Sequence, residues 1–194
     1  MSRREATSQE SRQILLRAAA ELFAENGYRA TTFEHIAERS GISRGSIPWH
    51  FGNKEGLLKA VIDDIRTTGI GAAGAVTSFE DALDQLFEHI RQPTSRLAIT
   101  LLAEAIEPDS PLTAVCADLQ ATLRKWLADS LGGVTLPSGM NEDTFITVVH
   151  GSIIGVHQQW RVAPEAIDLD TACAAIKTLF VASTKPRRKQ SERS

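Results

Sequence analysis

Apolar residues recur at intervals of three and four along almost the whole chain, and this periodicity constrains the fold more than any other feature. Strict alternation of apolar and polar residues, which is typical of strands, is almost absent. The β-branched run over residues 144–156 looks like a buried strand, but no helix breaker lies between Asn141 and Arg161, and strands of that length are rare. The sequence therefore predicts an all-α fold of about nine helices.

Turn and cap residues place the first four helices. The first two are expected over residues 9–26 and 31–41, the third from Ser43 as its N-cap, and the fourth from Lys54. Gly27 ends the first helix, and residues 31–34, Thr-Thr-Phe-Glu, have the spacing of a capping box. Glycines within residues 69–74 weaken the fourth helix, because each costs about 1 kcal/mol relative to alanine.

Further breaks divide the rest of the chain into five more helices. They lie at residues 92–95, 108–111, 132–141 and 163–164. Ser110 and Pro111 predict the cap and the first residue of the seventh helix. The ninth helix fades after Ser183 into a basic tail with too few apolar residues to pack. The expected domains are residues 1–53, residues 54–184 with a linking helix over 54–74, and a disordered tail over 185–194.

The charge is unevenly distributed along the chain. The net charge of -3 and the pI near 6.0 argue at first against a nucleic-acid partner. Residues 1–54, however, carry +2, residues 55–184 carry -9, and residues 185–194 carry +4. A basic head and tail thus flank an acidic body, which indicates different partners for different parts.

Residues 33–50 have the spacing of a helix-turn-helix. Ala37 stands where two helices would cross closely, and Gly41 fits a turn position that needs a positive φ. Ile47 would pack the second helix of the pair onto the first. Any short helical hairpin can show this triplet by chance, so the surrounding residues have to decide.

Residues 11–60 carry a much more specific pattern. It includes Ile36-Ala37, Gly41-Ile42-Ser43, Gly45 and, over residues 49–58, Trp-His-Phe-Gly-Asn-Lys-Glu-Gly-Leu-Leu. This part of the chain resembles the N-terminal DNA-binding domain of TetR-family transcriptional regulators almost throughout. Residues 155–170 resemble, more weakly, the last pair of helices through which members of that family dimerise.

The resemblance implies a set of DNA contacts. Arg44 and Ser46 would face base edges in the major groove, where Arg44 could make a bidentate contact to guanine worth about 1–3 kcal/mol. Gly45 would let the backbone approach the DNA closely. Tyr28, His50 and Lys54 would touch the sugar-phosphate backbone and fix the register, whereas Trp49 would either pack or touch a sugar. The full set is Tyr28, Thr31, Thr32, Ser43, Arg44, Gly45, Ser46, Trp49, His50 and Lys54.

Some of these positions allow a second interpretation or depart from the family. Thr31 and Thr32 would cap the second helix, whose N-terminal amides suit a phosphate. Tyr28 could equally pack against the first helix. Pro48 stands where the family usually has tyrosine, and proline inside a helix removes an amide hydrogen bond at a cost of about 3 kcal/mol. We therefore expect a kinked or 3₁₀-like start of the recognition helix.

The resemblance also implies that the acidic body binds a small molecule and dimerises. The candidate pocket residues, most of which would be ordinary core in any such set, are Phe79, Phe87, Leu101, Cys116, Trp126, Phe145, Val149, His150, Ile153 and His157. The expected dimer interface of the eighth and ninth helices would use Thr147, Gly151, Gly155, Gln159, Trp160, Ile176 and Phe180. His150 and His157 are more simply two hydrogen-bonded core histidines than a metal pair.

Motifs of enzymes and cofactor sites are absent from the sequence. Glu104 and Glu107 form an E-x-x-E pair, but a di-metal helical bundle needs two E-x-x-H motifs, and the chain has none. Nucleophile-elbow, zinc-protease, phosphate-loop and dinucleotide motifs are missing as well. Cys116 and Cys173 lack metal-ligand spacing and are expected to be free thiols. We expect no catalysis, no cofactor and no metal site.

The sequence predicts a cytoplasmic, homodimeric transcription factor, most simply a repressor that a small molecule releases from a palindromic operator in double-stranded DNA. No stretch approaches the ~20 apolar residues of a membrane span, and the N-terminus lacks the apolar core of a signal peptide. Glycines weaken the end of the fourth helix. A bound ligand would therefore favour a dimer whose two DNA-binding heads no longer match successive major grooves. Two alternatives stay open: a DNA-binding regulator without a small-molecule ligand, and a dimeric ligand-binding protein that has lost DNA binding because of Pro48.

Overall fold

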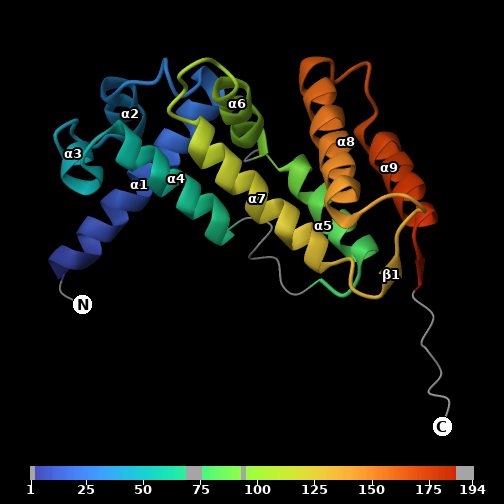
Figure 1. The fold of residues 1–194 in the computed structure, drawn as a ribbon. Helices are drawn as coiled ribbons and strands as arrows, with labels where there is room; N and C mark the ends of the chain where they lie inside the picture. Colours follow the sequence, from blue (N-terminus) through green and yellow to red (C-terminus); the bar gives the residue numbers. More distant parts are fainter. Residues whose placement is uncertain (1–2, 69–75, 93–94, 187–194) are drawn as a thin grey trace, which may run out of the picture. The chain divides into compact units, whose positions relative to one another are not determined.

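The chain is helical over most of residues 3–68, 76–92 and 95–186, which the computed structural model describes (Figure 1). In this part the helices are α1 (Arg3–Asn26), α2 (Phe33–Ser40), α3 (Ser46–Phe51), α4 (Lys54–Thr68), α5 (Phe79–Arg91), α6 (Ser95–Ala105), α7 (Thr113–Asp129), α8 (Glu142–Val162) and α9 (Leu169–Ser183). Two strands of two residues each, β1 (Val134–Thr135) and β2 (Lys185–Pro186), accompany them. The prediction of an all-α fold with about nine helices is confirmed.

The described residues fall into two compact units. The first unit contains α1 to α4, α6 and the start of α7, and the second contains α5, the rest of α7, α8, α9 and both strands. The sequence placed a boundary after residue 53, ahead of α4. The compact units differ from that division, because α4 and α6 both pack against α1.

The core of the first unit is built from the apolar stripes of its helices. Leu15 and Phe23 of α1, Ile36 of α2, Ile47 of α3 and Leu57 of α4 are fully buried in one cluster. The apolar face of α1 is therefore part of this core. Burial of five such side chains fixes α2 and α3 against α1, which holds the helix-turn-helix in one geometry.

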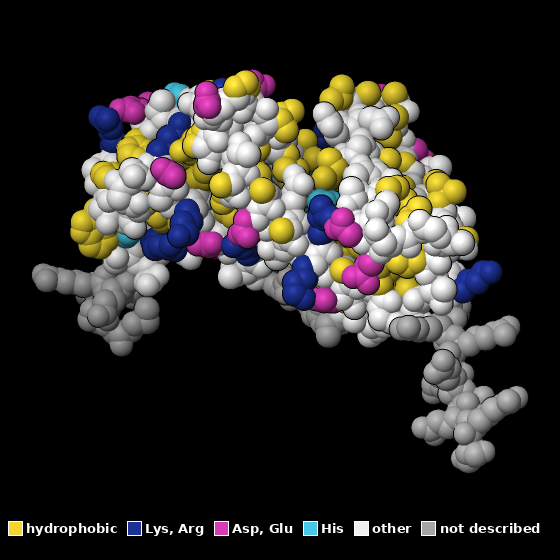
Figure 2. Space-filling model, in the orientation of Figure 1, with side chains coloured by type: hydrophobic (Ala, Val, Ile, Leu, Met, Phe, Trp, Pro, Cys, Tyr) yellow, Lys and Arg dark blue, Asp and Glu magenta, His cyan; other side chains and the backbone are white. Residues whose placement is uncertain are grey.

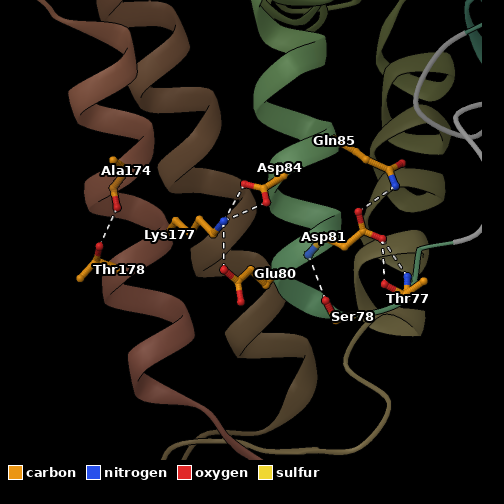
Figure 3. Close-up of polar contacts among 9 residues, drawn as sticks. All are labelled: Thr77, Ser78, Glu80, Asp81, Asp84, Gln85, Ala174, Lys177 and Thr178. Atoms are coloured by element: carbon orange, nitrogen blue, oxygen red, sulfur yellow. Dashed lines mark hydrogen bonds and ion pairs between the residues drawn. The ribbon is translucent and has the colours of Figure 1, made fainter.

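The core of the second unit joins α5, α8 and α9 through aromatic rings. The centroid of the Phe145 ring lies 5.5 Å from that of Phe79 and 5.7 Å from that of Phe180. At the surface of the same three helices, Lys177 of α9 pairs with two carboxylates of α5 (Figure 3). Its Nζ lies 2.8 Å from Asp84 Oδ2 and 3.0 Å from Glu80 Oε1. The pair ties α9 to α5 in addition to the core.

The ends of the helices correct several expectations. α1 begins at Arg3, six residues before its expected start at residue 9. α7 begins at Thr113, so Pro111 precedes the helix, although Ser110 Oγ does accept a hydrogen bond from the amide of Leu112. Asn141 caps α8 and Asp168 caps α9 through their side chains. Cap chemistry is local, but which of several polar residues becomes the cap depends on packing.

The two strands form a short antiparallel ladder that the sequence did not predict. Val134 pairs with Pro186 and Thr135 with Lys185, within segments expected to be a polar break and the start of a disordered tail. Residues 187–194 of that expected tail lie outside the described residues. The glycine-weakened segment over residues 69–74 lies outside them as well.

Candidate nucleic-acid interface

The turn between α2 and α3 has the geometry of a helix-turn-helix. Gly41 takes the left-handed conformation with a φ of 70°, and its amide donates to Ala37 O at 2.9 Å. A residue with a Cβ rarely adopts this conformation, which explains the glycine. Ile36 and Ile47, one from each helix, are fully buried beneath the turn. Of the predicted triplet, Gly41 takes the turn conformation and Ile47 is core, while Ala37 is half-buried.

Only one of the two expected threonine caps is present. Thr32 is the N-cap of α2, and its Oγ1 accepts a hydrogen bond from the amide of His35 at 3.3 Å. His35, not Glu34, completes the capping box, because its Nδ1 accepts from the amide of Thr32 at 3.4 Å. Thr31 is fully buried, and its hydroxyl donates to Gly27 O at 2.7 Å. The prediction that Thr31 caps α2 is wrong, and its buried side chain faces no DNA-binding surface.

The segment that leads into α3 explains how Pro48 is tolerated. The amides of Ser46 and Ile47 donate to Ser43 O and Arg44 O at 2.9 and 3.2 Å, which is 3₁₀ spacing. Pro48 follows as the third residue of α3, where an amide has no partner within the helix. The expected 3₁₀-like start is confirmed, whereas the cost of an interior proline does not apply. Ser43 is also not the N-cap, since Gly45 holds that position.

Several predicted contact residues are exposed around α3. The Arg44 side chain is 66% exposed and Trp49 is 72% exposed. Gly45 is exposed too, and Ser46 and His50 are half-buried. The His50 ring packs edge-on against Trp49, with 4.5 Å between centroids. Burial, and to a smaller extent the charge of Arg12, lower the pKa of His50.

Tyr28 and Lys54 pack together on the first unit. Tyr28 is only 7% exposed, and its ring contacts Phe23 edge-on at 5.4 Å. Lys54 Nζ lies 4.5 Å from the centre of the Tyr28 ring and donates to Arg29 O at 3.1 Å. Burial lowers the pKa of Lys54 and raises that of Tyr28. The alternative interpretation of Tyr28, that it packs against the first helix, fits this geometry.

A carboxylate that the sequence did not assign holds the turn after α1. Glu104 of α6 accepts the amide of Tyr28 on Oε1 at 2.6 Å and the amide of Arg29 on Oε2 at 3.0 Å. Gly27, with a φ of 84°, leaves the room that this carboxylate needs, because a Cβ there would collide with Oε1. No local pattern could have indicated this role, since the partners lie 75 and 76 residues apart. We call this arrangement the Glu104 clamp.

The predicted pocket residues do not all lie in one compact unit. Leu101 and Cys116 belong to the core of the first unit, and the other eight belong to the second. Seven of those eight are buried, and Trp126 is half-buried. Their sequence positions therefore do not define a single site, and the pocket stays a prediction.

The two histidines of α8 are buried neutral groups. Burial lowers the pKa of each from 6.5 to about 4, with smaller effects from Arg124 on His150 and from Arg161 and His89 on His157. Arg161 Nε donates to His157 Nε2 at 3.2 Å, so the proton of the neutral ring is on Nδ1. Within residues 3–68, 76–92 and 95–186, no three His, Cys, Asp or Glu side chains are grouped to hold a metal ion.

The expected interface residues of α8 and α9 differ in exposure. Thr147, Gly151 and Gln159 are exposed, and a Cβ at Gly151 or Gly155 would meet open space. Ile176 is only 7% exposed and belongs to the core of its own subunit, which corrects its assignment.

Apolar side chains also reach the surface over these two helices (Figure 2). Val148 and Val162 on α8 and Leu179 on α9 are large exposed hydrophobic residues. The sequence-based set had not included them. The residues of such a helix are apolar on nearly every face. The sequence therefore could not indicate which apolar side chains are exposed.

Comparisons with known proteins agree with this geometry. The family model described as bacterial regulatory proteins, tetR family, matches residues 15–61. The chain is 31% identical over 144 residues to the transcriptional repressor AcnR of Corynebacterium efficiens, covering 72% of this chain and 74% of AcnR. It is 26% identical over 180 residues to the transcriptional regulator TtgR of Pseudomonas putida, covering 84% and 85%.

A solved structure extends the similarity to the whole fold. The complex of SmeT with triclosan matches with a TM-score of 0.68 at 18% identity, covering 95% of this chain and 99% of SmeT, a repressor from Stenotrophomonas maltophilia. The chain belongs to the TetR family of bacterial transcriptional regulators. It is therefore a DNA-binding regulator and not an enzyme. No helix in the described ranges is long and apolar enough to cross a membrane.

Proposed function

We propose that the chain is a cytoplasmic repressor that binds a palindromic operator as a homodimer and leaves it when a small molecule binds. The exposed start of α3 is the observation that carries the DNA-binding part. Arg44, just before α3, and Trp49, within it, are exposed on a segment whose Ile47 is fully buried. A firmly packed helix that presents a cation and an aromatic ring outward suits the major groove.

The proposed contacts follow from exposure and charge. Arg44 reads a guanine, while Ser43, Gly45 and Ser46 bring the backbone close to the base edges. The capped N-terminus of α2 at Thr32 and the side chains of Trp49, His50 and Lys54 meet the sugar-phosphate backbone. Thr31 leaves the set because it is buried, and Tyr28 supports Lys54 from beneath.

Exposed faces of α8 and α9 support the proposed dimer. Gly151 and Gly155 have no packing role within one subunit, since a Cβ at either would meet open space. Val148, Val162 and Leu179 present apolar surface on the same two helices. A two-fold pairing through these faces would place two recognition helices symmetrically and require a palindromic site.

Relatives support the proposed repression and the proposed effector. AcnR is named a repressor, and the SmeT structure contains triclosan. Candidate effector contacts in this chain are the residues of the predicted pocket that lie in the second unit, including Phe87, His150 and His157. Because both histidines are neutral, they would offer hydrogen bonds to an uncharged ligand.

A titration of labelled DNA by fluorescence anisotropy tests the DNA-binding part. We expect salt-sensitive binding to a palindromic duplex from the region flanking the gene, and about tenfold or greater weakening by Arg44→Ala. Lys125→Ala is the matched control, because it removes one exposed positive charge from α7 in the second unit. Equal weakening by both variants, or binding to no flanking duplex, would contradict the proposal.

The same assay separates the two alternatives. A regulator that does not respond to a small molecule would bind the duplex, and no compound that binds the protein would release it. A protein that has lost DNA binding would bind compounds but no duplex. The second alternative was motivated by Pro48, and the position of this proline in the first turn of α3 removes that motive.

A further inference from the structure

The side chain of Arg44 is paired on the surface of the first unit. Its Nε lies 2.9 Å from Oε1 of Glu34, the second residue of α2. Both side chains are more than half exposed, at 66% for Arg44 and 53% for Glu34. An exposed pair of this kind contributes little to folding stability. The pair therefore affects the contact between Arg44 and DNA more than it affects folding stability.

The atoms of the pair decide which edge of the guanidinium can read a base. Arginine has one N–H on Nε and four on its two terminal nitrogens. The carboxylate oxygen of Glu34 occupies the edge of the guanidinium that carries the Nε–H. The end formed by the two terminal nitrogens is left to contact a base. Guanine O6 and N7 require two parallel donors, which that end supplies. The ion pair thus favours one orientation of Arg44 and one mode of guanine recognition.

The charge of Glu34 has a second effect at the same surface. A carboxylate beside phosphates opposes binding to every duplex, whatever its sequence. The gain from an oriented Arg44 arises only where a guanine stands opposite it. Since specificity is the difference between two binding free energies, the orientation of Arg44 increases it, whereas the charge of Glu34 lowers both affinities alike and leaves the difference unchanged.

We propose that Glu34 is a positioning residue that orients Arg44 toward guanine and so raises the specificity of the protein for its operator. The inference rests on the DNA-binding function proposed above. It adds a specificity-determining residue on α2, outside the recognition helix.

Anisotropy titrations with two duplexes test the inference. One duplex is selected by the wild-type protein from a randomised library, and the other is a scrambled duplex of the same length, both at one salt concentration. The proteins are wild type, Glu34→Gln, Arg44→Ala and the double variant. Glu38→Gln is the matched control, because it removes the same charge from an exposed position of the same helix. Circular dichroism and thermal melting confirm that every variant is folded.

We expect Glu34→Gln to lower the ratio of specific to non-specific affinity by about three- to fivefold and to relax the preference for guanine at one position. Glu38→Gln should leave both unchanged. In the Arg44→Ala background, Glu34→Gln should no longer affect base preference, which a merely structural role of Glu34 would not produce.

Three outcomes would overturn the inference. They are an unchanged ratio in Glu34→Gln, an equal change in Glu38→Gln, and an equal effect of Glu34→Gln with and without Arg44. Failure of the proposed function itself looks different. In that case no duplex is selected, or Arg44→Ala binds the selected duplex as the wild type does.

Discussion

At the scale of single residues, the Glu104 clamp joins α6 to the turn that precedes α2. One carboxylate accepts two consecutive amides, those of Tyr28 and Arg29. Lys54 contacts the same turn through Arg29 O and the Tyr28 ring. The backbone position of the proposed phosphate contacts therefore depends on a residue of α6.

Replacing Glu104 with glutamine should destabilise the protein. One of the two amides would then face the NH₂ group of the glutamine and lose its acceptor, which costs about 1–3 kcal/mol. Urea unfolding measures this loss. Glu107→Gln is the control, because Glu107 is exposed and is the other acid of the E-x-x-E pair. Equal loss of stability in both variants would show that charge alone matters.

Single residues could be predicted where the reason is local. Gly41 was identified because a left-handed turn position requires glycine, and Ile47 because its spacing places it on the core. Thr31 and Thr32 could not be distinguished, because only packing decides which of them is buried. Glu104 could not be found, since its partners are remote in sequence.

At the scale of elements, helix type was predictable and helix ends were less so. Periodicity gave the helices because each buries one face, but the start of α3 follows from a 3₁₀ turn that no periodicity records. The same turn removes the conflict that Pro48 raised in the sequence. The strand pair β1 and β2 escaped prediction because two residues are too short for any pattern.

The histidines of α8 should make stability depend on pH. His150 and His157 have pKa values of about 4 in the folded chain against 6.5 as the ordinary value. The unfolded chain therefore binds more protons between these limits. Above pH 6.5 both states are neutral at these sites, and stability should fall as the pH drops from 6.5 toward 4, by about 2–3 kcal/mol per histidine.

Urea unfolding at several pH values measures this dependence. His157→Gln should show a shallower fall than the wild type over the same range. A measurement near pH 7.5 is the control, because there the two proteins differ only by the lost contacts. An unchanged slope in the variant would mean that His157 is not the titrating group.

At the scale of the whole molecule, the acidic charge and the proposed DNA-binding surface belong to different parts of the sequence. The net charge of -3 hides a head of +2 and a body of -9. The family and fold followed from the sequence, whereas the extent of the compact units did not. α6 packs with the first unit through contacts that are distant along the chain.

Filling the exposed glycine of α8 should weaken the proposed dimer without unfolding the subunit. Gly151→Leu places a side chain in open space within one chain, and it should favour the helix by about 1 kcal/mol. In a close helix pair the same side chain would hold the subunits apart, and we expect dimerisation to weaken by about tenfold or more. Sedimentation equilibrium over a range of concentrations measures this change.

Ala121→Leu is the control for that experiment, because Ala121 is an exposed small residue of α7. It should lower helix propensity only slightly and leave the association unchanged. If Gly151→Leu associates as the wild type does, the exposed face of α8 is not the interface.

The fit between Gly27 and the Glu104 carboxylate also couples the effects of mutations at these two positions. A side chain at residue 27 would meet Glu104 Oε1 and would be strained at a φ of 84°. Because that oxygen is the end of a flexible side chain, a Cβ at residue 27 would displace the carboxylate and release the two amides that it holds. A change at either position therefore costs the same two hydrogen bonds, and a smaller residue 104 leaves the backbone strain at residue 27 in place.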